Sequence, residues 1–146
     1  MTITVSGVKE LNVALRSLGI NADKAINMGV EATAQQVRNT AIKSIQSVSA
    51  GETVQRSRQG GNGTYSHVAS KPGDAPNTDT GRLVASVAIE RPTLSSALVG
   101  TGLDYGLFLE LGTSKMQPRL WLQPALDANI KQLPINVCKA IQRLLK

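Results

Sequence analysis

Cysteine and histidine are almost absent from this chain of 146 residues, which has one of each. Cys138 cannot form an intramolecular disulfide, and its apolar neighbours in a helical pattern predict a buried thiol rather than a nucleophile. His67 lies in a glycine-rich stretch without the partners of a catalytic triad, and a single imidazole cannot build a metal site. We therefore expect a solvated loop histidine, no metal or cofactor, and no enzymatic activity.

Long apolar runs are missing as well. No stretch approaches the roughly 18 to 20 consecutive apolar residues of a membrane span, and residues 1–7 lack the features of a signal peptide. These absences predict a soluble protein, made in the cytosol, with no membrane partner. With 41% hydrophobic residues the chain can bury one modest core, so we expect a single domain over residues 1–146.

Basic residues outnumber acidic ones and give a net charge of +6. They are dispersed along the chain, and no aromatic residues are interleaved with them to stack on bases. This distribution disfavours a dedicated nucleic-acid reader, although a small basic DNA-binding protein stays open as an alternative. An acidic protein partner suits the same charge.

The N-terminal part predicts two helices after a short alternating stretch, residues 2–5, that suits an edge strand or an arm. The first helix covers residues 8–18, where leucines and valines recur at spacings of three and four, and Gly19 ends it. The second begins near Asn21 or Asp23, either of which can cap it, and runs to Val48. Its apolar line follows one helix face and comprises Ile26, Val30, Ala34, Val37, Ala41, Ile45 and Val48. A helix of this length is expected to lie across a sheet.

Residues 49–80 are rich in glycine, serine, proline and charge, which predicts a long flexible loop that orders when it meets a partner. A loose hairpin built on Val54, Tyr65 and Val68 is the alternative. Three basic residues of this loop are expected to face an acidic partner or passing DNA, with a protein favoured: Arg56, Arg58 and Lys71.

The C-terminal half mixes strands and helices. The pattern predicts helical turns at residues 80–86, paired strands at 86–92 and 95–101, a short helix at 105–111, and a final helix from Pro124 that Pro134 interrupts. The fold class is therefore α+β: a long N-terminal helix packed on a small antiparallel sheet, with a short helix and a C-terminal helix.

Aromatic residues are scarce, at 3% of the chain, yet three of them fall within residues 102–127: Tyr105, Phe108 and Trp121. Such a concentration of apolar area predicts packing or docking at this place. We expect Leu107, Phe108 and Leu111 to be buried, and Trp121 to fold over the same cluster, either in the core of the domain or in a subunit interface.

Glu110 lies among these apolar residues. If it is covered it needs a cationic partner, for which Arg119 and Arg82 are the candidates, in the same subunit or the next. An exposed helix carboxylate is the alternative.

Several short motifs follow one another in a fixed order. Ala75-Pro76 precedes Thr80-Gly81-Arg82-Leu83 with Ser86; then come Tyr105 with Glu110 and Gly112-Thr113, and Pro118-Arg119 through Leu122, Pro124 and Ala125. In order and content, residues 70–127 resemble the neck and tail-completion proteins of long-tailed phages, typified by the tenth gene product of a lambdoid siphophage. The chain differs from that pattern at Gly106, where alanine is commoner, and at Leu120-Trp121, where Pro-Phe is commoner.

The resemblance implies a virion structural protein that forms a sixfold ring, completes the tail and joins it to the head. Its implied partners are copies of itself, head connector or stopper proteins, and tail-terminator or tail-tube proteins. The implied location is the virion, after assembly in the host cytoplasm. A tail-terminator ring capping the tail tube is an alternative within the same class.

Overall fold

The computed structural model describes residues 2–4, 6–17, 21–58 and 60–145. The chain divides into two compact units, which are described separately. The first contains residues up to Asn39 together with 88–100 and 125–146, and the second contains residues 40–87 and 101–124. Helices and small antiparallel sheets make up the chain, which confirms the predicted α+β class.

The long helix α2 (Ala22–Gln46) begins and packs much as the sequence predicts. The N–H of Lys24 donates to Asn21 Oδ1 at 3.0 Å, so Asn21 is the N-terminal cap. The expected apolar line from Ile26 to Ile45 is almost fully buried. Val48 was wrongly placed on that line: the helix ends at Gln46, and the Val48 side chain is 81% exposed.

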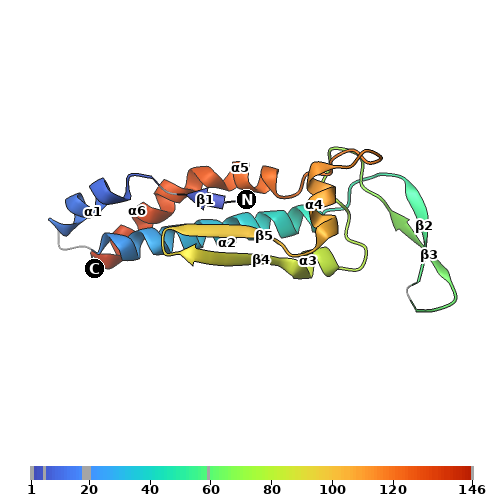
Figure 1. Cartoon of the computed structure of the whole chain (residues 1–146), viewed down its shortest axis with the longest axis horizontal. Coiled ribbons are helices and arrows are strands. Elements are labelled where there is room, and N and C mark those ends of the chain that lie inside the picture. Colours follow the sequence, from blue (N-terminus) through green and yellow to red (C-terminus); the bar gives the residue numbers. More distant parts are fainter. Residues whose placement is uncertain (1, 5, 18–20, 59, 146) are drawn as a thin grey trace. The chain divides into compact units, whose positions relative to one another are not determined.

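In the first unit, a three-stranded antiparallel sheet has the order β1 (Thr2–Thr4), β5 (Ser96–Thr101), β4 (Val87–Thr93). The β4–β5 hairpin runs alongside α2 (Figure 1). Arg91 of β4 connects the two elements, because its guanidinium donates to Glu31 and to Asn27 Oδ1 on α2. Hydrogen bonds from Gln35 and then from Arg91 lower the pKa of the Glu31 carboxyl.

The short helix α1 (Val8–Arg16) is also in the first unit and packs Leu15 against Ala22, with Leu11 partly buried beside them. The predicted end of this helix at Leu18 and Gly19 lies outside the described residues, as does Val5 of the N-terminal strand. α1 therefore has the expected start and the expected buried leucine.

The C-terminal region consists of α5 (Gln123–Asn129), a 3-10 turn (Ile130–Gln132) and α6 (Leu133–Leu144). Pro134 lies in the first turn of α6, which confirms the predicted interruption. α6 packs closely on α2 in the first unit: a Cβ added at Gly29 would lie 2.4 Å from Val137 Cγ2, and the buried Asn136 amide donates to Thr33 Oγ1 at 2.9 Å.

The prediction that Cys138 is buried was wrong. The buried residues of α6 are Asn136, Val137 and Ala140. Cys138 follows Val137 and lies about 100° further round the helix. The thiol is therefore on the exposed side.

The second unit contains the hairpin of β2 (Thr53–Ser57) and β3 (Thr64–Val68), with α3 (Arg82–Ser86) and α4 (Asp104–Leu111). Val54 pairs with His67, and Arg56 with Tyr65, which confirms the hairpin alternative for the segment 49–80. Asn77 secures the base of this hairpin: its Nδ2 donates to the carbonyls of Ser49 and Val68, each at 2.8 Å. The flexibility of this segment stays a prediction.

Candidate functional site

The end of α4 and the start of α5 meet at a corner held by Glu110. Its carboxylate accepts three backbone N–H groups, from Trp121 at 2.9 Å, Leu122 at 3.0 Å and Gln123 at 2.8 Å. The first N–H groups of a helix have no intrahelical acceptor and carry partial positive charge, so a carboxylate placed there satisfies and stabilises them. Glu110 thus caps α5 from another helix.

Within the described part of the chain, Glu110 does not pair with Arg82 or Arg119, and the alternative of an exposed carboxylate was wrong because Glu110 is partly buried. Pairing with an arginine of a neighbouring subunit stays a prediction. The partners of Glu110 within the chain are backbone groups, which carry no sequence signature. Arg119 instead donates to the carbonyl and the hydroxyl of Ser70. Among the described residues, neither Arg82 nor Arg119 has a carboxylate partner.

Trp121 completes the corner inside its own chain. It is 2% exposed, and its indole Nε1 donates to the carbonyl of Gly106 at 3.2 Å. Gly106 is required here: a Cβ at this position would lie 2.5 Å from Thr101 Cγ2 and 3.1 Å from Leu83 Cδ1. The departure from alanine at Gly106 therefore has a steric cause, and Trp121 packs within the subunit.

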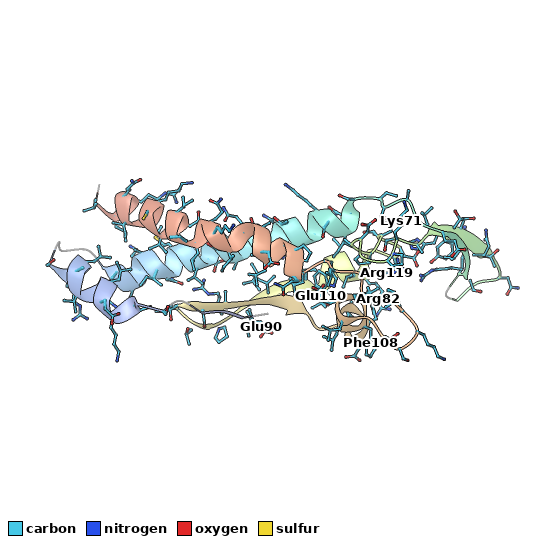
Figure 2. The ribbon with its side chains drawn as sticks, turned by 90° about the horizontal axis from the view of Figure 1, so that it is seen from above. Lys71, Arg82, Glu90, Phe108, Glu110 and Arg119 are labelled. Atoms are coloured by element: carbon cyan, nitrogen blue, oxygen red, sulfur yellow. The ribbon has the colours of Figure 1, made fainter. Side chains whose placement is uncertain are left out.

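The outer face of α4 is apolar and exposed. Leu107 is 56% exposed, Phe108 52% and Leu111 69%, and Tyr105 beside them is 39% exposed. The first three are therefore not buried in the core of the chain, because Gly106, Leu109 and Glu110 occupy the inward side of this short helix. Their burial in a subunit interface, the other alternative, stays a prediction. Figure 2 shows Phe108 on the outer side of α4. We call Leu107, Phe108 and Leu111 the α4 face.

Gly112 ends α4 in a conformation that favours glycine, with φ 75°. A Cβ there would lie 2.8 Å from the carbonyl oxygen of Met116 and 2.9 Å from Pro118, so the chain turns back tightly. The N–H of Arg119 then donates to the carbonyl of Leu109 at 2.7 Å. The Gly112-Thr113 and Pro118-Arg119 motifs therefore form one closed turn beneath α4.

Asp79 attaches the β2–β3 hairpin to the segment that precedes α3. Its carboxylate pairs with Arg56 at 3.0 Å, accepts a hydrogen bond from the Tyr65 hydroxyl at 2.7 Å, and lies 3.7 Å from His67 Nδ1. The hydrogen bond to Asp79 raises the pKa of the Tyr65 phenol. The expectation of a solvated His67 was wrong: the hairpin turns it toward Asp79, and its side chain is 11% exposed.

The three basic residues predicted to contact a partner have different surroundings. Arg56 is paired with Asp79, whereas Arg58 and Lys71 are exposed. The hairpin therefore carries less free positive charge than its sequence indicates.

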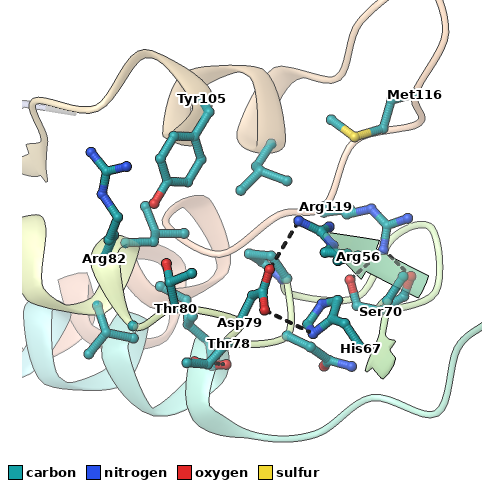
Figure 3. Close-up of a pocket in the computed structure, with 18 residues that line it drawn as sticks. Arg56, His67, Ser70, Thr78, Asp79, Thr80, Arg82, Tyr105, Met116 and Arg119 are labelled. Atoms are coloured by element: carbon teal, nitrogen blue, oxygen red, sulfur yellow. Dashed lines mark hydrogen bonds and ion pairs between the residues drawn. The ribbon is translucent and has the colours of Figure 1, made fainter. Parts of the chain in front are cut away.

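A cavity of about 380 Å³ opens in the second unit between these features. Its lining combines the apolar side chains of Leu83, Leu109 and Met116 with arginines and hydroxyl groups. Figure 3 shows Arg82 and Tyr105 on one side of this pocket and Arg119 on the other, with Asp79 and Thr80 between them. The pocket could not be predicted from the sequence, because its lining comes from segments spread between Ile45 and Arg119.

Neither a metal-binding cluster nor a membrane-spanning helix is found in the described part of the chain. No group of three or more histidine, cysteine, aspartate or glutamate side chains is arranged to hold a metal ion there. Among the described residues, no helix has both the length and the apolar character needed to cross a membrane.

Comparison of the chain with protein-family models, curated proteins and solved structures finds no match. Functional inference therefore depends on the residues and geometry of this chain.

Proposed function

We propose that this chain is a structural protein of a tailed-phage virion, which forms a ring in the neck or at the top of the tail and joins the tail to the head. The observation that carries the proposal is the α4 face, a cluster of large apolar side chains that the single chain leaves more than half exposed. Contiguous exposed apolar patches are a recognised mark of protein interaction sites.

The setting of the α4 face supports an assembly role. The helix is fixed from behind by the three hydrogen bonds to Glu110, by the indole of Trp121 and by the turn at Gly112. A face that is already rigid loses little conformational entropy when it binds. This arrangement suits a docking surface that must meet the same partner in every copy.

The motifs behind the resemblance to neck proteins have structural roles in the second unit. Thr80-Gly81 precedes α3, Glu110 caps α5, and Gly112-Thr113 closes α4. These structural roles are compatible with the neck or tail-completion role that the resemblance implies. Arg56, one of the basic residues on which the DNA-binding alternative depends, forms an ion pair with Asp79, which weakens that alternative.

Electron microscopy of virions that lack this chain tests the proposal. We expect mature DNA-filled heads and complete tails that remain separate. Separate tails of irregular length would assign the chain to the tail-terminator alternative instead. Normal joined virions would contradict a structural role at this junction.

A further inference from the structure

The pocket beneath α4 combines an apolar part with polar and charged groups. Leu83, Leu109 and Met116 line it, and its volume of about 380 Å³ is in the range of ligand-binding sites. Thr80 and Tyr105 add hydroxyl groups to the same lining. A cavity of this kind accepts a large apolar side chain together with part of the backbone that carries it.

The charges around the pocket are not balanced. Arg56 is neutralised by Asp79, at 3.0 Å. Arg119 donates only to the uncharged oxygens of Ser70, and Arg82 has no hydrogen bond or ion pair among the described residues. Glu110, a nearby carboxylate that could pair with these arginines, instead accepts hydrogen bonds from backbone N–H groups. Two guanidinium charges at the pocket therefore lack a counter-charge.

These two charges are separated. Figure 3 places Arg82 and Arg119 on opposite sides of the opening. A single small anion cannot meet both arginines and fill the apolar part at the same time. The complementary ligand has an apolar centre and a negative charge on each side of it.

We propose that this pocket binds an acidic peptide segment of a partner protein, with an apolar side chain inserted against Leu109 and Met116 and flanking carboxylates paired with Arg82 and Arg119. The occupant comes from a different protein. No two acidic residues of this chain lie closer than five positions apart, so none of its apolar residues has an acidic residue within two positions on each side. A DNA phosphate fits the pocket poorly, since it offers charge without an apolar group. The inference depends on the pocket alone and holds whether or not the chain forms a ring.

The test is a titration of the full-length, ¹⁵N-labelled protein with a short synthetic peptide that has a central leucine and an aspartate on each side. We expect saturable shifts of backbone resonances at the lining residues, weakened by added salt. Two comparison peptides replace the aspartates by asparagine or the leucine by serine. Each should bind at least about fivefold more weakly, because each lacks one of the two features that the pocket recognises.

Arg82→Gln is the matched protein variant, because Arg82 is exposed, so that we expect its replacement to leave the fold intact. We expect about fivefold weaker peptide binding, or more. Lys131→Gln removes the same charge from an exposed position in the first unit and should leave binding unchanged. No shifts at millimolar peptide, equal binding of the asparagine peptide, or an unaffected Arg82→Gln variant would each overturn the proposal. Displacement of the peptide by a short DNA duplex would assign the pocket to phosphate instead.

Discussion

Glu110 shows how one carboxylate can organise a corner that sequence patterns do not reveal. Its three hydrogen bonds, from 2.8 to 3.0 Å, join the end of α4 to the beginning of α5. Hydrogen bonds to a charged acceptor are about twice as strong as neutral ones. The residue therefore fixes the position of the helix that carries the α4 face.

The first prediction concerns this carboxylate. Glu110→Gln keeps one acceptor oxygen but removes the charge, so we expect a loss of roughly 1–2 kcal/mol in the free energy of unfolding. The melting temperature should fall by roughly 3–6 °C. The change in melting temperature is measured by thermal unfolding, with circular dichroism as the signal. Glu90→Gln, at an exposed residue, is the control. Equal melting temperatures for the two variants would show that the cap does not stabilise the corner.

The second prediction concerns Gly106. Alanine normally stabilises a helix relative to glycine by about 1 kcal/mol. Here the added Cβ would meet Thr101 Cγ2 at 2.5 Å, and overpacking of this kind costs roughly 1–3 kcal/mol. We expect Gly106→Ala to be destabilising in denaturant unfolding, whereas Gly102→Ala, which meets nothing within 4 Å, should be neutral. A stabilised Gly106→Ala variant would show that the close approach to Thr101 is relieved at no cost.

At the scale of elements, Asp79 holds the β2–β3 hairpin in place. A two-stranded hairpin is marginally stable by itself, so beyond its base, which Asn77 secures, its attachment depends on the contacts of Asp79 with Arg56 and Tyr65. We expect Asp79→Asn to loosen the hairpin above its base while the rest of the second unit stays folded. Amide hydrogen exchange should become several-fold faster in β2 and β3 only. The exposed Glu52→Gln variant is the control, and unchanged exchange in Asp79→Asn would contradict the role of Asp79.

The same contact predicts a dependence on alkaline pH. The pKa of Tyr65 is raised in the folded state by its hydrogen bond to Asp79, so the protonated phenol stabilises the fold. This contribution is complete below the ordinary tyrosine pKa of about 10 and is lost as the pH rises through the higher folded value. An NMR titration of the Tyr65 ring should show late ionisation, and earlier ionisation in Asp79→Asn. A Tyr65 pKa that is the same in both proteins would exclude the coupling.

The helices and the hairpin could be predicted because their signals are local. The apolar line of α2, the break at Pro134 and the alternation in β4 follow directly from residue spacing. The environments of Glu110, His67 and Cys138 could not be predicted in this way. They depend on which elements meet in space, and on which side of a short helix faces inward. Apolar spacing predicted that the α4 face is buried, but it could not distinguish the core of the chain from a subunit interface, because both bury large apolar side chains.

For the whole molecule, the exposed α4 face predicts self-association. Changing both Phe108 and Leu111 to serine removes apolar area that the single chain does not bury, so the free energy of unfolding should change by less than about 0.5 kcal/mol per site. In analytical ultracentrifugation, the wild-type protein should form the proposed ring and the double variant should form smaller species. Val13→Ser, at a residue 73% exposed in α1, is the control that should still associate. Rings formed equally by all three proteins would place the interface elsewhere.

The most direct test of the account is the restoration of infectivity to phage particles assembled without this chain. Purified wild-type protein added to the unjoined heads and tails should restore the titre of infectious particles. The variant with serine at positions 108 and 111 should be folded yet restore at least about tenfold less. Full restoration by that variant would contradict a role for the α4 face, and no restoration by the wild-type protein would contradict the proposed joining of head and tail.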